Sequence, residues 1–149
     1  MRARPEGTER GQVAVMFALV LALVLSGLVA LVGDVILLYD AAGRYDNGAL
    51  VGAQAGASQV DTLQLRQGVV VLDPGQAIRV CREAAGVTSG LTADSPAVHC
   101  AVSTDGKSVT ADVTNRVPLV FAAYGPGLTI SRKHTGTIAV GESQGASPP

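Results

Sequence analysis

The stretch VAVMFALVLALVLSGLVALVGDVILLY, residues 13–39, decides the architecture of this 149-residue chain. Only four of its residues fall outside the hydrophobic set: Ser26, Gly27, Gly33 and Asp34. The part up to Gly33 is uncharged, and a helix rising about 1.5 Å per residue crosses a hydrocarbon core of ~30 Å within that length. The sequence therefore predicts a transmembrane helix over residues 13–39.

The charges that flank this span predict its orientation. Arg2, Arg4 and Arg10 precede it, whereas Arg44 alone follows it closely. By the positive-inside rule, residues 1–12 are a cytoplasmic N-terminus and the chain after Tyr39 is extracytoplasmic. A cleaved secretory signal is the competing interpretation, but its apolar region is only ~7–15 residues long. We therefore expect a single-pass protein retained in a lipid bilayer.

Asp34 allows two interpretations. An ionisable side chain inside a membrane helix is a functional candidate by default. Alternatively, Asp34 lies at the level of the lipid headgroups at the outward end of the span, where a carboxylate costs little. Position alone leaves both interpretations open for this intramembrane or interfacial acid.

Composition excludes several classes of function. The chain is 48% hydrophobic but only 3% aromatic and 15% charged, with a formal net charge of −1. Rings that would line a small-molecule pocket are scarce, and the clustered basic residues that bind nucleic acid are missing. His99 and His134 stand without the cysteines or carboxylates of a metal site. Because no catalytic motif occurs either, we expect neither an enzyme, a cofactor nor a small-molecule substrate.

Beyond the span, the expected organisation is an outward helix continuation over 40–60, an α+β domain over 61–141 and a disordered tail over 142–149. The continuation carries a ridge of small residues, Gly48, Gly52 and Gly56, that admits close approach of another backbone. Packing on the chain's own sheet is the favoured use of this ridge, and packing on a helix of another protein is the alternative.

The domain begins with a short strand candidate over 69–72 and then a helix. Asp73 is the expected N-cap, Pro74 the first helical residue and Gln76 its capping-box partner. Gly86 is expected to end this helix. With the hairpin and last strand described next, the sequence predicts an α+β fold: a small domain with one helix packed on a short antiparallel sheet.

A hairpin follows, centred on Asp105-Gly106, the preferred pair for a type I′ turn. Its expected inward pairs are Val102–Val109, Cys100–Ala111 and Val98–Val113. A last strand over 128–140 is expected to be interrupted near Gly136.

The two cysteines, Cys81 and Cys100, fall on the inner faces of the helix and of the hairpin. In an exported domain this favours a disulfide, with two separate buried thiols as the alternative.

The last strand also carries a basic trio, Arg132 to His134. We interpret it as a solvated strand end, with a contact for acidic cell-surface polymers as the alternative.

The segment from Arg10 to Ala57 resembles the TadE/TadG-like proteins of tight-adherence (Flp-type) pilus assembly. The shared features are Arg10-Gly11-Gln12 before the span, an acid (Asp34) and a tyrosine at its end, and an Ala-rich continuation near Asp46-Asn47. The helix and hairpin that follow extend the resemblance to about residue 140. It implies a non-enzymatic, pseudopilin-like protein of the bacterial cell membrane with a pilin-like outer domain. Its N-terminal helix would bind other membrane proteins of pilus assembly or secretion.

The resemblance also implies a processing site. Prepilin peptidase cuts after a glycine, here Gly11, so that Gln12 would become the first residue. Its substrates carry a glutamate five residues after the cut, where this chain has Met16. We therefore expect a minor or accessory component rather than a major filament subunit. The alternative function is a membrane-tethered extracytoplasmic module that binds cell-wall polymer or another envelope protein.

Overall fold

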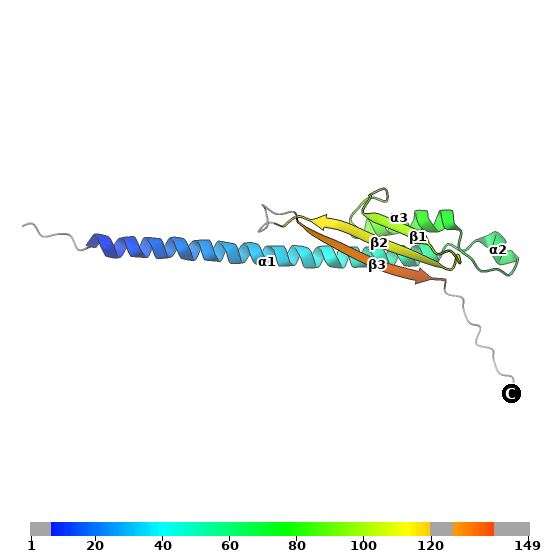
Figure 1. Ribbon diagram of the computed structural model, residues 1–149, viewed down its shortest axis with the longest axis horizontal. Coiled ribbons are helices and arrows are strands. Elements are labelled where there is room, and N and C mark those ends of the chain that lie inside the picture. The colour runs from blue at the N-terminus through cyan, green and yellow to red at the C-terminus, as the bar shows by residue number, and fades with distance from the viewer. Residues whose placement is uncertain (1–6, 120–126, 139–149) are drawn as a thin grey trace, which may run out of the picture. The chain divides into compact units, whose positions relative to one another are not determined.

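The computed structural model describes residues 7–119 and 127–138, with side chains from Gln12 onward. The elements follow in the order α1 (Gly7–Ala57), α2 (Thr62–Arg66), α3 (Pro74–Ser89), β1 (Val98–Val102), β2 (Ser108–Val117) and β3 (Leu128–Thr137) (Figure 1). The expected α+β class is confirmed: a long apolar N-terminal helix is joined to a small antiparallel sheet of order β1-β2-β3.

The chain divides into two compact units. The first contains residues 1–39 and 118–128, and the second contains residues 40–117 and 129–149. The C-terminal part of α1, from Asp40, thus lies in the second unit. The buried alanines of this part, Ala41, Ala49, Ala53 and Ala57, belong to the core of that unit. Residues 40–57 therefore pack as part of the α+β domain.

The β1–β2 hairpin has the expected register. Val98 pairs with Val113, Cys100 with Ala111 and Val102 with Val109. Because side chains alternate between the faces of a strand, the odd-numbered residues of β2 point inward, and Val109, Ala111 and Val113 are all fully buried. Helix α3 covers this inner face where it contacts β1 and β2.

The turn of the hairpin differs from the expected type I′. Such a turn needs a positive φ at both central residues. Here Gly106 has φ +67°, whereas non-glycine residues with positive φ do not occur in the described part of the chain. The Gly106 N–H donates to the Ser103 carbonyl, and the Asp105 carboxylate accepts from the Ser103 hydroxyl and from the Lys107 N–H. These bonds hold Asp105 in a negative-φ conformation.

Helix α3 begins as expected but ends later. The Asp73 carboxylate accepts from the N–H groups of Gly75 and Gln76, as an N-cap does. The capping box is not formed, because the Gln76 side chain accepts from Arg79 instead. The helix continues through Gly86 to Ser89 and ends at Gly90, which has φ +74°.

Gly86 has a different role from the expected one. A Cβ on Gly86 would lie 2.9 Å from the Ala93 backbone nitrogen, so the following loop lies directly on the helix at this residue. The absent side chain therefore permits packing rather than a helix end.

The strand expected over 69–72 is also wrong. Leu72 forms only an isolated bridge to Val60, and its N–H donates to the Gly106 carbonyl. The segment between the two bridge residues contains the short α2, which is capped by Asp61.

Strand β3 runs to Thr137 without an interruption at Gly136. A Cβ on Gly136 would lie 2.4 Å from the Ala53 carbonyl oxygen, so only glycine lets β3 lie directly on α1. The predicted continuation of this strand over 139–140 and the predicted tail over 142–149 lie outside the described residues.

Candidate functional site

The glycine ridge of α1 packs against α3. A Cβ on Gly48 would lie 2.9 Å from the Ser89 Cβ, and one on Gly52 would lie 2.7 Å from the Ala85 Cβ. A Cβ on Gly56 would lie 2.9 Å from the Ala77 carbonyl oxygen. As the residue numbers increase along α1, the numbers of the contacted residues decrease along α3. The two helices therefore run antiparallel.

The favoured expectation placed this ridge on the sheet, and the structure corrects it. The partner is helix α3, and Gly56 also reaches the sheet, where a Cβ would lie 3.0 Å from Val109. The physical reason is that α3 presents small residues of its own, Ala77, Cys81 and Ala85, at the same four-residue spacing. Two backbones can then approach closely along a matched seam.

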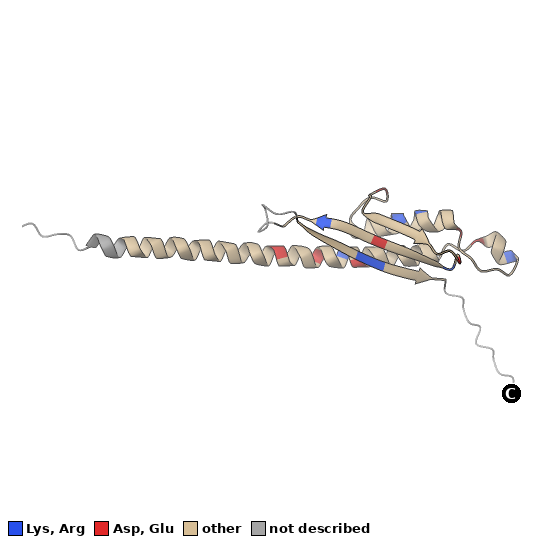
Figure 2. Cartoon of the chain, viewed as in Figure 1, with Lys and Arg blue, Asp and Glu red and all other residues tan. Residues whose placement is uncertain are grey.

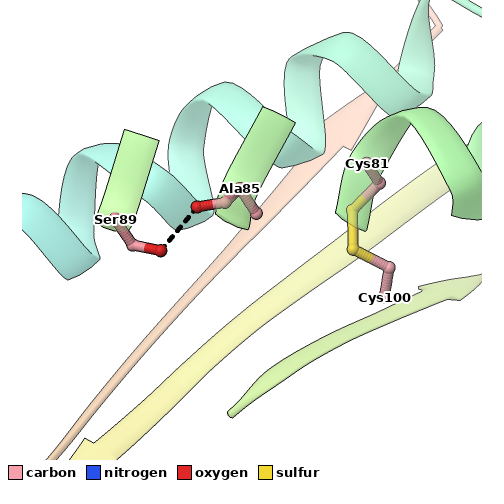
Figure 3. Close-up of a disulfide and its surroundings, with 4 residues drawn as sticks. All are labelled: Cys81, Ala85, Ser89 and Cys100. Carbon is pink, nitrogen blue, oxygen red and sulfur yellow. Dashed lines mark hydrogen bonds between the residues drawn. A yellow bond between two sulfur atoms is a disulfide. The ribbon is translucent and has the colours of Figure 1, made fainter. Parts of the chain in front are cut away.

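The disulfide between Cys81 and Cys100 is present and joins α3 to β1 (Figure 3). Cys81 is 0% exposed, and its Cβ lies 3.0 Å from where a Cβ on Gly56 would be. The bridge thus lies where α1, α3 and β1 meet. Further along α3, the buried Ser89 hydroxyl donates to the Ala85 carbonyl at 2.6 Å, which satisfies it inside the same seam (Figure 3).

Polar contacts tie the remaining strands to α1. The Asn115 side-chain amide of β2 donates to the Tyr45 hydroxyl at 3.1 Å. On β3, the His134 Nε2 lies 3.0 Å from the Asp46 carboxylate, and the Arg132 Nε lies 4.0 Å from the same oxygen. These contacts were not predicted from the sequence. Tyr45 and Asp46 lie just before the glycine ridge on the same helix, but their partners are far away in the sequence.

The basic trio is therefore divided by the alternation of β3. Arg132 and His134 face α1 through Asp46, whereas Lys133 is an exposed residue between them. The interpretation of the whole trio as a solvated strand end is wrong for His134, which is only partly exposed.

In the first unit, α1 exposes its apolar side chains on every side. From Val13 to Ile36 the large aliphatic and aromatic residues are all exposed. Between Val13 and Gly33 the helix carries no charged residue (Figure 2). Helix α1 is long and apolar enough to span a membrane. Asp34 is the exception on this surface because it is buried, at 7% exposure.

The predicted processing site lies at the edge of the described side chains. The backbone of Gly11 and Gln12 is helical within α1, and Gln12 is exposed. The Gly11 environment lies outside the described side chains.

Among residues 12–119 and 127–138, no group of three or more His, Cys, Asp or Glu residues could hold a metal ion. A perturbed carboxyl group lies at the hairpin turn. There the hydrogen bonds from the Ser103 hydroxyl and the Lys107 N–H lower the pKa of Asp105. This exposed turn carboxylate has a structural explanation that requires no ligand.

No protein-family model, curated protein or solved structure matches the chain.

Proposed function

We propose that the chain is a single-pass membrane protein with a cytoplasmic N-terminus and an extracytoplasmic domain, acting as an accessory of tight-adherence pilus assembly. The observation that carries the proposal is the exposed apolar surface of α1 over residues 13–37, followed by a compact disulfide-bonded unit. Exposed apolar patches of this extent on a protein need lipid or protein to cover them. A structural disulfide favours an oxidising compartment for the second unit.

The pilus role rests on the resemblance of residues 10–57. In this role the protein acts by contact alone: α1 packs with other membrane helices, and the second unit is a rigid outer domain. Asp34 is the charged residue within this apolar stretch of α1, and we place it near the outer membrane interface. The structure of the second unit explains how a glycine-rich helix stays ordered there.

The topology is tested by thiol labelling of the full chain in intact cells. Thr104→Cys lies at an exposed turn of the second unit, and Glu9→Cys lies before the span. With a membrane-impermeant maleimide, Thr104→Cys should react in intact cells, and Glu9→Cys should react only after permeabilisation. The reverse labelling pattern would refute the orientation.

The function is tested by deleting the gene and restoring it. We expect loss of surface pili and adherence, recovery with the wild-type chain or with Gly43→Ala, and no recovery with Gly52→Leu, which cannot fit against α3. Gly43 is the matched control because a Cβ there meets nothing within 4 Å. Unchanged pili and adherence in the deletion strain would reject the pilus role.

Processing is tested by the mass of the membrane-extracted protein. Because Met16 replaces the usual glutamate, we expect the bond after Gly11 to stay intact. A chain that begins at Gln12 would show cleavage by a peptidase.

A second candidate function is the membrane-tethered binding module. The outer face of the sheet favours it because hydroxyls line neighbouring strands: Thr110 contacts Thr135 at 3.2 Å, and Thr114 donates to Ser131 at 2.9 Å. Retention of the detergent-solubilised full chain on purified cell wall, without pilus proteins, would support this function over the first. A fragment that begins at Ser58 is unsuitable, because it lacks the glycine ridge that packs on α3.

A further inference from the structure

Among residues 7–119 and 127–138, no strand pairs with the edge of β3 that faces away from β2. Among the described strands, β3 is last in the order β1-β2-β3. The Ile138 N–H donates to the Lys107 carbonyl at 3.0 Å, which continues the pairing with β2. Because backbone groups of successive residues alternate between the two edges of a strand, those of Thr135 and Thr137 point to the opposite edge. Such a row of donors and acceptors can pair with another extended chain.

A groove runs beside this same part of the edge. Its volume is about 590 Å³, and it is lined by Leu50, Gln54 and Ala57 of α1 and by residues 135–138. Gly136 brings β3 directly onto Ala53, so α1 forms a floor beside the strand. A strand added to the edge would place every second side chain on this floor, where Leu50 is 38% exposed.

The charged residues of β3 indicate which kind of extended segment could pair with this edge. Strand β3 contains Arg132, Lys133 and His134 but neither Asp nor Glu, and the Asp46 carboxylate is shared by Arg132 and His134. Pairing of two β3 strands about their centres would set these basic residues against their copies, which is unfavourable. An extended segment that carries carboxylates would instead be attracted, most directly by the exposed Lys133.

We propose that the free edge of β3 is a strand-addition site for an extended, acidic segment of another protein. Small or apolar residues of that segment lie over Leu50 and Ala57 at alternate positions, and its carboxylates lie beside Lys133. Main-chain hydrogen bonds to Thr135 and Thr137 supply the register, as in β-augmentation. This site is independent of the proposed pilus role. Basic residues on an edge strand also prevent aggregation, but that role alone does not require the groove.

The test measures peptide binding to the full chain in detergent micelles. The probe is a labelled eight-residue peptide of alternating valine and glutamate, and the comparison peptides are alternating valine and lysine, octaglutamate, and residues 128–137 of this chain. We expect the valine–glutamate peptide to bind at least about tenfold more tightly than each of the others. Equal binding of octaglutamate would indicate a site for acidic polymer, and tighter binding of the 128–137 peptide would indicate a second copy. Either result overturns the proposal.

A matched pair of proline variants tests the backbone contact. Thr135→Pro removes an N–H that points to the free edge beside the groove, whereas Thr129→Pro removes one on the same edge outside it. We expect Thr135→Pro to lower the affinity for the valine–glutamate peptide at least about tenfold. Thr129→Pro should change this affinity less than about twofold. Equal effects of the two variants overturn the proposal.

A third variant and a direct measurement keep the test decisive if a proline variant does not fold. Lys133→Glu should reverse the preference toward the valine–lysine peptide. In the wild-type chain, peptide binding should slow amide exchange at Thr135 and Thr137. An unchanged preference in Lys133→Glu, or unchanged exchange at both amides under saturating peptide, overturns the proposal.

Discussion

The seam between α1 and α3 makes a quantitative prediction for Gly52→Ala. The added methyl would lie 2.7 Å from the Ala85 Cβ and 2.9 Å from the Cys81 carbonyl oxygen. Neither atom can rotate away, so the helices must separate, at a cost of about 1–3 kcal/mol. Alanine also stabilises a helix by about 1 kcal/mol relative to glycine. With a steric cost of about 2 kcal/mol, the middle of that range, we expect Gly52→Ala to lower the free energy of unfolding by about 1 kcal/mol.

Gly43→Ala is the matched control for this variant. It lies on the same helix in the same unit, and a Cβ there meets nothing within 4 Å. In Gly43→Ala the alanine therefore stabilises the helix without a steric clash, and the variant should stabilise the unit by about 1 kcal/mol. The two variants should differ by about 2 kcal/mol.

The assay is amide hydrogen exchange of α3 in the full chain, in detergent micelles. Where exchange reports local opening, a difference of 2 kcal/mol corresponds to about thirtyfold in rate, at about 1.4 kcal/mol per decade. The protected amides near Ala85 should therefore exchange about thirtyfold faster in Gly52→Ala than in Gly43→Ala. Equal rates in the two variants would refute the close packing of the ridge on α3.

Three further predictions concern the second unit. Cys100→Ser opens a loop with a sequence separation of 19 and should lower the free energy of unfolding by about 3 kcal/mol in urea titrations, as should reduction of the wild-type chain. Asp73→Ala removes two N-cap hydrogen bonds and should cost about 1 kcal/mol by the same measurement. The lowered pKa of Asp105 means that its stabilising effect is present above the pKa of the unfolded chain and is lost as pH falls through the folded pKa. NMR titration should therefore show the Lys107 amide losing protection at acid pH, and this loss should be absent in Asp105→Asn.

Much of the second unit could be predicted because its determinants are local. The alternation of small apolar residues on either side of Asp105-Gly106 predicts every inward pair of the hairpin, and all three pairs are confirmed. The hairpin and the amphipathic helix together orient Cys81 and Cys100 toward each other, and the bridge is formed. Asp73 caps its helix as predicted, because an N-cap needs only the two residues that follow it.

Predictions failed where one residue type serves two purposes. Gly86 and Gly90 are both compatible with a helix end, and the choice depends on the loop that packs against Gly86. Gly136 looked like an interruption of a strand, but it is the position where β3 meets the Ala53 carbonyl. In each case the deciding atoms belong to another segment, which local patterns do not identify.

The sequence by itself determined that a helix over 13–39 is apolar and long enough to cross a membrane, because hydropathy and length are properties of contiguous residues. It also determined that Gly48, Gly52 and Gly56 form a close-packing ridge, because their spacing places them on one side of a helix. Only the tertiary structure decided what that ridge contacts, namely α3. The pairing of Asp46 with His134 likewise joins residues 88 positions apart. This contact forms only because β3 packs closely on α1, where Gly136 lies against Ala53.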